Sequence, residues 1–458
     1  MSTQRSVDVV VIGAGPAGTS AAYHLKKAGA SVCILEARER IGGRTRSDVM
    51  DGAWFEIGGQ WVSPDQTELL AILDELGLHT YPRYREGDSI YLDHDGNTHR
   101  YQGEWFPTSE ETLKEMKRLV EVMDELAAAM DPARPWDHPQ AAELDSQTFE
   151  QWLATQSSDA EARKNIAIFV AGGMLTKPAY AFSALQAVFM ACSAGSFSNL
   201  VDENFILNER VVGGMQKVSL TLAEKVGEEN IILNCPVRTL EYSDEGVIAR
   251  GDGGVEVRAR YAILAIPPNL YDRITYVPEL PRKLHIAHQH QSMGLVIKVH
   301  AAYETPWWRE KGLSGTCFSS KNLVQEIYDN TNYGETRGTL VGFVTDKTAE
   351  EMFALPVEER KHQILTAMAK MLGDEVMNPI AYYESDWAAE EWTRGAYANS
   401  WDMGGLSRWG HTATEPVGPI HFACSDIAAE GFQHVDGALR RGRQVAGSLT
   451  QLLTEGKG

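Results

Sequence analysis

Two charged side chains in this sequence lie in apolar segments of strand-like character, where a charge is costly. These residues are Lys298 and Glu326. A buried ammonium or carboxylate is unfavourable unless it has a partner, so a lone lysine more often extends to solvent and a lone glutamate more often faces it. Strand alternation predicts that Val324, Glu326 and Tyr328 point to one face. A buried carboxylate there could offset the cost of burying a cationic ligand.

A glycine-rich turn near the start of the chain indicates a second kind of chemistry, the binding of a dinucleotide. Residues 7–12 are mostly apolar and β-branched, which predicts a buried parallel strand. Gly13, Gly15 and Gly18 follow at G-x-G-x-x-G spacing, and residues 17–28 are predicted to form a helix. These glycines permit a tight turn, close approach of a pyrophosphate and close helix packing, with the helix N-terminus facing the anion.

A second predicted strand, residues 31–35, ends at Glu36. A carboxylate at this place accepts a hydrogen bond from a ribose hydroxyl and argues against the 2′-phosphate of NADP. A lone G-x-G-x-x-G also occurs as an ordinary turn. Here the strand, turn, helix, second strand and acidic residue all follow in order, which favours dinucleotide binding.

The next segments resemble the flavin-containing, monoamine oxidase-like amine oxidase family. Residues 39–45, E-R-I-G-G-R-T, are similar to the family's E-R-x-G-G-R, which lies along the flavin and its pyrophosphate. Residues 53–62 resemble its second glycine pair, beside the isoalloxazine ring, where small residues let a planar ring contact the backbone. The resemblance covers nearly the whole chain and implies FAD. The implied cofactor-binding residues are Gly13, Gly15, Gly18, Glu36, Arg38, Gly43, Arg44, Gly58, Gly59, Gln60, Trp61, Val237, Trp387, Ala396, Asp426 and Val435.

The resemblance also implies catalytic roles for Lys298, Tyr397 and His434. In the family, the lysine of the G-x-V-I-K strand holds a water at flavin N5. Tyr397 matches one wall of an aromatic cage, and His434 stands where the other wall is a second tyrosine. We expect His434 to be neutral, because a cation would repel the substrate ammonium. Membrane-bound relatives bond the flavin to a cysteine at the position of Ala396, so the alanine implies a non-covalent flavin.

The segment Gln325–Asn330 resembles most specifically the family members that oxidise diamines. There the glutamate matching Glu326 binds the distal ammonium, and together with Tyr397 and His434 it forms the implied substrate site. The implied reaction converts putrescine and O2 to 4-aminobutanal, ammonia and hydrogen peroxide. Alternatives are a broader monoamine oxidase, an L-amino-acid oxidase, for which no substrate-binding arginine is identified, and a non-catalytic flavin-binding module, against which Lys298 and Tyr397 argue.

We expect an α/β fold, in which a Rossmann-type FAD-binding domain is interleaved with a substrate domain of mixed sheet and helices. Residues 1–80, 208–292 and 395–458 are assigned to the FAD domain, and 81–207 and 293–394 to the substrate domain. The further expected elements are helices over 67–76, 110–130 and 219–226, a hairpin over 89–101, and strands over 231–233, 247–249, 255–257 and 261–265.

Composition limits the remaining partners. The 458 residues carry 63 acidic and 42 basic side chains, a formal charge of −21, which argues against nucleic acid or an anionic membrane as a partner. The five cysteines are widely spaced without a C-x-x-C, which fits reduced thiols in a cytosol and no metal site. We find no signal peptide and no apolar tail, and expect a soluble, cytoplasmic protein. The family resemblance makes a homodimer the expected assembly.

Overall fold

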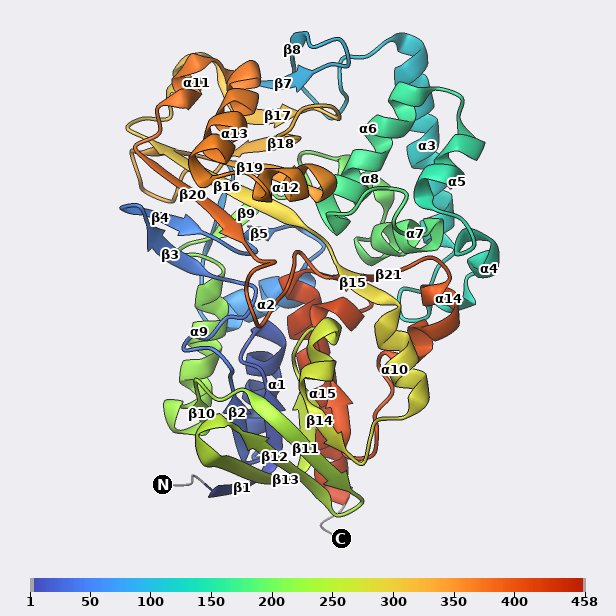
Figure 1. Cartoon of the computed structure of the whole chain (residues 1–458), viewed down its shortest axis with the longest axis vertical. Helices are drawn as coiled ribbons and strands as arrows, with labels where there is room; N and C mark the ends of the chain where they lie inside the picture. The colour runs from blue at the N-terminus through green and yellow to red at the C-terminus, as the bar shows by residue number, and fades with distance from the viewer. Residues whose placement is uncertain (1–3, 456–458) are drawn as a thin grey trace.

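The computed structural model describes residues 4–455, which fold around two large β-sheets in opposite halves of the molecule (Figure 1). The chain passes between the sheets several times, so each sheet collects strands from distant parts of the sequence. The α/β fold expected from the sequence is confirmed.

The first sheet is built around β1 (Gln4–Ile12), whose last four residues are β-branched and buried. β1 pairs in parallel with β2 (Val32–Leu35) on one side and with β13 (Val255–Leu264) on the other. The glycine turn after β1 therefore lies at the carboxyl edge of parallel strands, where α/β sheets bind their ligands. The spatial order is β10 (Ile231–Ile232), β2, β1, β13, β12 (Gly246–Gly251), β11 (Val237–Ser243) and β14 (Thr275–Val277), with β22 (Ile420–Phe422) also paired to β13.

β13 is one strand where the sequence analysis expects two. Between its two apolar segments, Arg258 and Arg260 alternate with the buried Val257 and Ala259. The period-two alternation therefore continues through the charged residues, and the strand does not break. Its first half pairs with β12 and its second half with β22.

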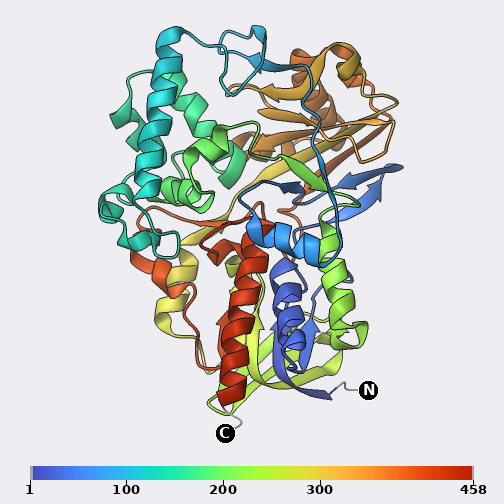
Figure 2. The same ribbon diagram turned by 180° about the vertical axis from the view of Figure 1, so that it is seen from behind.

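Three helices lie side by side on one face of the first sheet (Figure 2). They are α1 (Pro16–Lys27), α9 (Gln216–Val226), and α15 (Val435–Glu455). α1 packs against both of the others. At Gly442 of α15 an added Cβ would lie 2.3 Å from the carbonyl oxygen of Ala17, so a glycine lets these two helices touch.

The second sheet has seven strands, drawn from residues 88–101, 296–345 and 381–386. The predicted hairpin is confirmed as β7 and β8, which pair antiparallel. The spatial order is β20 (Ala381–Asp386), β16 (Val296–Tyr303), β19 (Gly338–Thr345), β18 (Glu326–Asp329), β17 (Leu313–Phe318), β7 (Asp88–Leu92) and β8 (Thr98–Tyr101).

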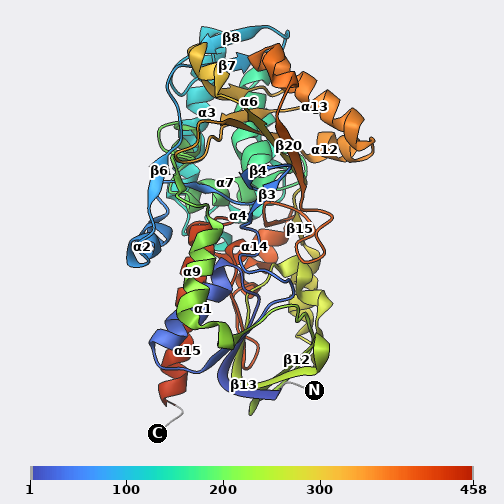
Figure 3. The ribbon, with the colours of Figure 1, turned by 90° about the vertical axis from the view of Figure 1, so that its left-hand side faces the viewer.

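The two faces of the second sheet have different partners (Figure 3). On the outer face, Ile297 and Val299 of β16 and Ile327 of β18 pack in an apolar cluster with α12 (Asp346–Phe353) and α13 (Val357–Leu372). The alternating residues of these strands, among them Lys298 and Glu326, line a cavity on the opposite face.

A bundle of helices closes this cavity face. Its helices are α3 (Glu110–Ala128), α4 (Ala141–Leu144), α5 (Phe149–Gln156), α6 (Ala160–Val170), α7 (Ala184–Ser193) and α8 (Phe197–Val201). The π-helical turn η2 (Ala171–Leu175) follows α6 directly and brings its glycines against the second sheet.

The remaining elements lie between the two large sheets or beside one of them. They are β3 (Ser47–Met50), β4 (Ala53–Glu56), β5 (Trp61–Val62), α2 (Thr67–Glu75), β6 (Thr80–Pro82), β9 (Glu209–Val211), α10 (Arg282–Gln289), β15 (Gln291–Met293), α11 (Trp307–Glu310), β21 (Asn399–Trp401) and α14 (Gly405–Trp409). Within residues 4–455, every helix is too short or too polar to cross a lipid bilayer.

Candidate active site

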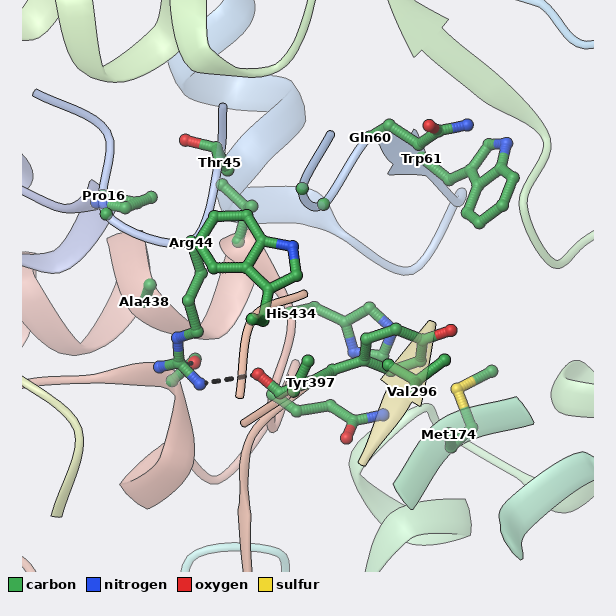
Figure 4. Close-up of a pocket in the computed structure, with 18 of the residues that line it drawn as sticks. Pro16, Arg44, Thr45, Gln60, Trp61, Met174, Val296, Tyr397, His434 and Ala438 are labelled. Carbon is green, nitrogen blue, oxygen red and sulfur yellow. Dashed lines mark hydrogen bonds between the residues drawn. The ribbon is translucent and has the colours of Figure 1, made fainter. Parts of the chain in front are cut away.

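One continuous cavity runs from the carboxyl edge of the first sheet to the inner face of the second, and it brings together most of the predicted site residues. Those on its wall are Gly13, Gly15, Glu36, Arg38, Gly43, Arg44, Gly58, Gly59, Gln60, Trp61, Val237, Lys298, Glu326, Trp387, Ala396, Tyr397, His434 and Val435. Figure 4 shows the labelled part of this wall, from Pro16 and Arg44 to Tyr397, His434 and Met174.

Gly18 and Asp426 lie behind the wall instead of on it. A Cβ at Gly18 would lie 1.9 Å from the carbonyl oxygen of Gly13, so this glycine packs α1 onto the sheet. The Asp426 side chain has no exposed area and forms an ion pair with Arg44. Both residues therefore shape the site without bordering its space.

The loop that contains Gly13 and Gly15 meets the loop that contains Gly43 at the cavity. Gly15 precedes α1, and a Cβ added to it would meet only Gly43 Cα, at 3.7 Å. Val435 and Ala438 also border the cavity, so the N-termini of both α1 and α15 reach it. Helix N-termini carry partial positive charge and free N–H groups, which suit an anionic pyrophosphate.

Glu36 holds the loop at the carboxyl end of β2. Its Oε2 accepts a hydrogen bond from the Ala14 amide at 2.7 Å, and its Oε1 accepts one from the Arg38 amide at 2.9 Å. Each carboxylate oxygen keeps a further lone pair for a hydroxyl. Arg38 is itself fixed by Glu390, at 3.2 Å from Nε. The carboxylate is therefore placed as a sugar-binding acceptor would be.

Arg44 ties three loops together around the cavity. Its Nη1 donates to the Tyr397 carbonyl at 2.8 Å (Figure 4) and to Asp426 Oδ1 at 3.1 Å, and Nη2 donates to Ser425 Oγ at 3.1 Å. Burial alone would raise the pKa of Asp426, but the Arg44 guanidinium outweighs it and the pKa is lowered. Asp426 also accepts from the Asn399 amide at 2.6 Å.

Gly58 and Gly59, which resemble the family's second glycine pair, have different roles. A Cβ at Gly58 would lie 2.0 Å from the Arg44 carbonyl oxygen, so Gly58 is required by the packing of the protein on itself. At Gly59, an added Cβ would meet only Thr45 Cγ2, at 3.9 Å. Gly59 thus leaves open space on the cavity wall, as expected of a glycine beside a planar ring.

Lys298 is buried and fully bonded. Its Nζ donates to the carbonyl oxygens of Glu56 and Gly58, at 2.7 and 2.8 Å, and to Gln60 Oε1 at 2.5 Å. Burial lowers its pKa to about 7; the Glu56 carboxylate opposes that shift and the Arg210 guanidinium adds to it. Near neutral pH the group is therefore divided between ammonium and amine.

A buried polar network surrounds this lysine. Gln60 Nε2 donates to Asn330 Oδ1 at 2.5 Å, and Arg210 donates to Glu56 Oε2 at 2.6 Å from Nη2 and to the Asn330 carbonyl at 2.8 Å from Nη1. The Arg210 and Glu56 side chains are each 1% exposed. Asn330 Nδ2 is the one buried side-chain atom of Lys298, Gln60, Glu56, Arg210 and Asn330 without a partner within residues 4–455, and the bonds among the others hold these groups in place.

Glu326 faces the same cavity from two strands away. It pairs in register with Phe343 of β19, which pairs in turn with Lys298 of β16. Its Oε2 accepts a hydrogen bond from the Tyr328 hydroxyl at 2.8 Å. Burial raises the pKa of Glu326 to about 7, and the Tyr328 hydrogen bond works in the opposite direction. Gly173 of η2 packs on it, since a Cβ there would lie 3.1 Å from Oε1.

The predicted alternation holds for two residues of this strand and is wrong for the third. Glu326 and Tyr328 both line the cavity. Val324 packs instead in the outer cluster, with Ile327 and α13. The reason is that β18 begins at Glu326, so the period of two does not extend back to Val324.

The aromatic part of the wall includes Tyr397, Phe343 and Trp61. The rings of Tyr397 and Phe343 meet edge to face at 6.2 Å, and those of Trp61 and Tyr328 at 5.5 Å. His434 also lines the cavity, and its Nδ1 lies 2.8 Å from the Phe432 carbonyl. This contact places a hydrogen on Nδ1 and leaves Nε2 as an acceptor in the neutral ring.

Sequence reasoning missed several residues of the site, among them Phe343, Arg83 and Gly173. Arg83 lines the cavity and lies over the Tyr328 ring, 4.9 Å from its centroid. Gly173 packs on Glu326. The signal available for Gly173 was a glycine pair inside a helical pattern, which often marks close packing. Arg83 comes from a segment with no distinctive pattern.

These residues fit a flavin dinucleotide. The cavity is bordered at one end by the glycine loops, two helix N-termini and Glu36, and at the other by an aromatic wall. Gln433 Oε1, in the cavity lining beside His434, has no hydrogen-bond partner among residues 4–455, so a bound group can supply one. Gly59 leaves room for a ring.

Comparison with known proteins gives the same result. The family model described as flavin containing amine oxidoreductase matches residues 16–450. A putrescine oxidase from Kocuria rosea is 59% identical, covering 97% of this chain and 96% of its own. A probable flavin-containing monoamine oxidase A from Dictyostelium discoideum is 32% identical, over 98% and 99%. A solved putrescine oxidase structure, wild type bound to putrescine, superposes with a TM-score of 0.97 at 59% identity, covering 98% of this chain and all of the other.

The family model's match spans more than nine-tenths of the chain and includes Gly43, Gly59, Lys298 and Tyr397, and it begins directly after the loop of Gly13 and Gly15. It confirms the flavin cofactor expected from the sequence. This chain therefore belongs to the flavin-containing amine oxidoreductase family.

Proposed function

We propose that this enzyme is a putrescine oxidase, which converts putrescine, O2 and water to 4-aminobutanal, ammonia and hydrogen peroxide. The Kocuria rosea relative has that name, and the solved relative is bound to putrescine. The observation that carries the proposal is the buried carboxylate of Glu326 on the wall that also holds Lys298 and Tyr397. A monoamine would leave this carboxylate without a cationic partner.

Glu326 is the proposed anchor of the distal ammonium. In the absence of a ligand its ionised form is disfavoured by burial, which raises its pKa to about 7. An ammonium beside it supplies the opposite charge, and the pair then leaves neither buried charge uncompensated. Tyr328 and Gly173 hold the carboxylate from two sides. The anchor is therefore positioned before the diamine arrives.

The reacting amine lies, in this proposal, among Tyr397, Phe343 and Trp61. Burial raises the pKa of the Tyr397 hydroxyl strongly, so the ring stays a neutral wall. His434 is neutral in this proposal, with Nε2 free to accept a hydrogen bond. A wall of neutral groups favours the uncharged amine, the form that can lose a hydride. When FAD is bound it accepts that hydride from the carbon that bears the amine.

Lys298 has the proposed role of holding a water near the flavin. As an ammonium it has three hydrogens, and Glu56, Gly58 and Gln60 accept all three. Only the neutral amine has a lone pair with which to accept a hydrogen bond from water. The lowered pKa of about 7 makes that form accessible near neutral pH.

The FAD is bound non-covalently in this proposal. Ala396 offers no thiol at the position where membrane-bound relatives have the bonded cysteine. Cys424 is the cavity's one cysteine within residues 4–455, and burial raises the pKa of its thiol strongly. The reactive thiolate is therefore scarce.

The proposal also includes a cytoplasmic homodimer. The family resemblance supports the dimer, and thiols that are all free within residues 4–455 support the cytoplasm.

An L-amino-acid oxidase is the main rival. Such an enzyme needs an arginine to bind the substrate carboxylate, and Arg83 is an arginine in the cavity. Arg83 bonds Thr316 of β17, three strands away from Lys298 of β16. In an amino acid the carboxylate is attached to the reacting carbon, so an arginine that binds it must lie near Lys298 and the flavin.

A peroxide-coupled assay of the purified enzyme tests the proposal. The substrates are putrescine, cadaverine, butylamine, benzylamine and L-amino acids. Putrescine should give the highest kcat/KM, with cadaverine close behind, because one methylene in an apolar pocket is worth only about 1–3 kcal/mol. Turnover of an L-amino acid or benzylamine without turnover of putrescine would reject it.

A further inference from the structure

Arg83 is a buried cation in the cavity without a carboxylate partner. The residue is 6% exposed, and it forms no ion pair within the part of the chain that the structure describes. Nη1 donates to Thr316 Oγ1 at 3.0 Å, and Nε donates to the Leu207 carbonyl at 3.3 Å. These contacts use two of the five N–H groups of the guanidinium.

Arg83 lies on the β17 side of Glu326, which is one strand further from Lys298. Lys298, Phe343 and Glu326 lie on β16, β19 and β18 in one row, and β17 is the next strand. Arg83 is bonded to Thr316 of β17 and covers the ring of Tyr328, whose hydroxyl donates to Glu326. The guanidinium therefore lies beside Tyr328, the residue that bonds Glu326, on the β17 side of the proposed distal-ammonium site.

Beyond Arg83 the cavity reaches the surface. Gly103 and Glu104, both exposed, line it there, together with the half-buried Glu203. Glu203 offsets part of the positive charge but forms no ion pair or hydrogen bond with Arg83. Burial lowers the pKa of Arg83 to about 10, so it remains a cation at neutral pH. Arg83 therefore contributes a positive charge to the wall of this outer part of the cavity.

We propose that Arg83 restricts the substrate to amines with two charges, by repelling a third ammonium. The inference rests on the proposed function. A four-carbon diamine ends at Glu326. A longer polyamine such as spermidine, bound with its secondary ammonium at Glu326, carries a third ammonium on a tail beside Arg83. Like charges repel strongly where protein excludes water, and this is a common means of rejecting the wrong ligand.

The test compares spermidine with N-butylputrescine, which has the same tail length but a methyl group in place of the third ammonium. The readout is the ratio of their kcat/KM values for oxidation at the aminobutyl end, with the aldehyde identified by mass. Wild type should favour N-butylputrescine by about tenfold or more. Arg83→Gln should bring the ratio to within about threefold of one. Any general loss caused by the replacement cancels in this ratio.

Two control variants separate charge from shape. Arg83→Lys keeps the charge and should keep the wild-type ratio. Arg134→Gln removes an exposed charge outside the cavity lining and should also keep it. A wild-type ratio of kcat/KM values near one would overturn the proposal without any variant. The proposal is also overturned if Arg83→Gln leaves that ratio unchanged or shifts it further toward N-butylputrescine. Wild type that does not oxidise putrescine would overturn the proposed function instead.

Discussion

Lys298 of β16 and Glu326 of β18 lie in one row across the second sheet, because each pairs with Phe343 of the strand between them. Neighbouring strands are about 4.8 Å apart, so the two backbones are roughly 10 Å apart. Residues in register on antiparallel strands point to the same face. The sheet therefore sets the separation between the flavin end of the cavity and its buried carboxylate.

The flavin should leave the protein on denaturation. Acid precipitation of the purified enzyme should release the yellow chromophore into the supernatant, because Ala396 and a protonated Cys424 offer no thiolate for a bond. Absorbance of the supernatant and of the washed pellet measures this. Colour that stays in the pellet contradicts non-covalent binding.

Gly59→Ala should weaken FAD binding without disturbing the protein. The added methyl meets only Thr45 Cγ2 within the chain, at 3.9 Å, so any clash is with the cofactor. Overpacking costs typically about 1–3 kcal/mol, which corresponds to roughly fivefold or more in the FAD dissociation constant. Fluorescence titration of the apoprotein measures it. Gly447→Ala, where a Cβ meets nothing within 4 Å, is the matched control. Equal FAD affinity in both variants would place the ring elsewhere.

Lys298→Met should slow reoxidation of the flavin by O2 more than its reduction by putrescine. The substitution removes the amine that we propose holds a water, and it leaves the carbonyl groups of Glu56 and Gly58 without their donor. Stopped-flow measurements of the two half-reactions distinguish the steps. If both proceed at the wild-type rate, Lys298 has no such role.

The preference for a diamine should depend on pH through Glu326. Burial raises the pKa of this carboxyl to about 7, so below that pH it is neutral and cannot pair with the distal ammonium. The ratio of kcat/KM for putrescine to that for butylamine should therefore rise as pH increases through about 7. The parameter kcat/KM reports groups of the free enzyme. Ionisation of the reacting amine affects both substrates and largely cancels. In Glu326→Gln the ratio should stay flat, and a wild-type ratio that is flat too would contradict the assignment.

The local parts of this site are predictable from sequence, and the non-local parts are not. Gly13, Gly15 and Glu36 follow from one strand–turn–helix–strand unit, because their roles depend on neighbours in the chain. The row that joins Lys298 to Glu326 depends on β19, which no local pattern identifies as their shared partner. The contact between Gly173 and Glu326 likewise joins segments far apart in sequence.

Packing also separates residues that sequence patterns treat alike. Gly58 and Gly59 are adjacent, yet only Gly59 leaves open space on the cavity wall. Predicted site residues can lie behind the wall, as Gly18 does, because a motif records every glycine that the fold needs and not only those that touch the ligand. Arg83 was missed because its burial depends on residues far away in the sequence. Its guanidinium bonds the Leu207 carbonyl and Thr316 of β17.

The central claim is that Glu326 anchors the distal ammonium of putrescine. Glu326→Gln keeps the shape of the side chain and removes its charge. A charge-assisted hydrogen bond contributes about 1.5–3 kcal/mol, so kcat/KM for putrescine should fall roughly tenfold or more. Butylamine lacks the distal ammonium, so its kcat/KM should change little. Wild type should accordingly prefer putrescine to butylamine.

The most direct measurement is the coupling energy from the four kcat/KM values of wild type and Glu326→Gln with putrescine and butylamine. We expect a coupling of about 1.5 kcal/mol or more, with the loss confined to putrescine. Equal losses for both substrates, and hence no coupling, would contradict the anchor and leave a general amine oxidase.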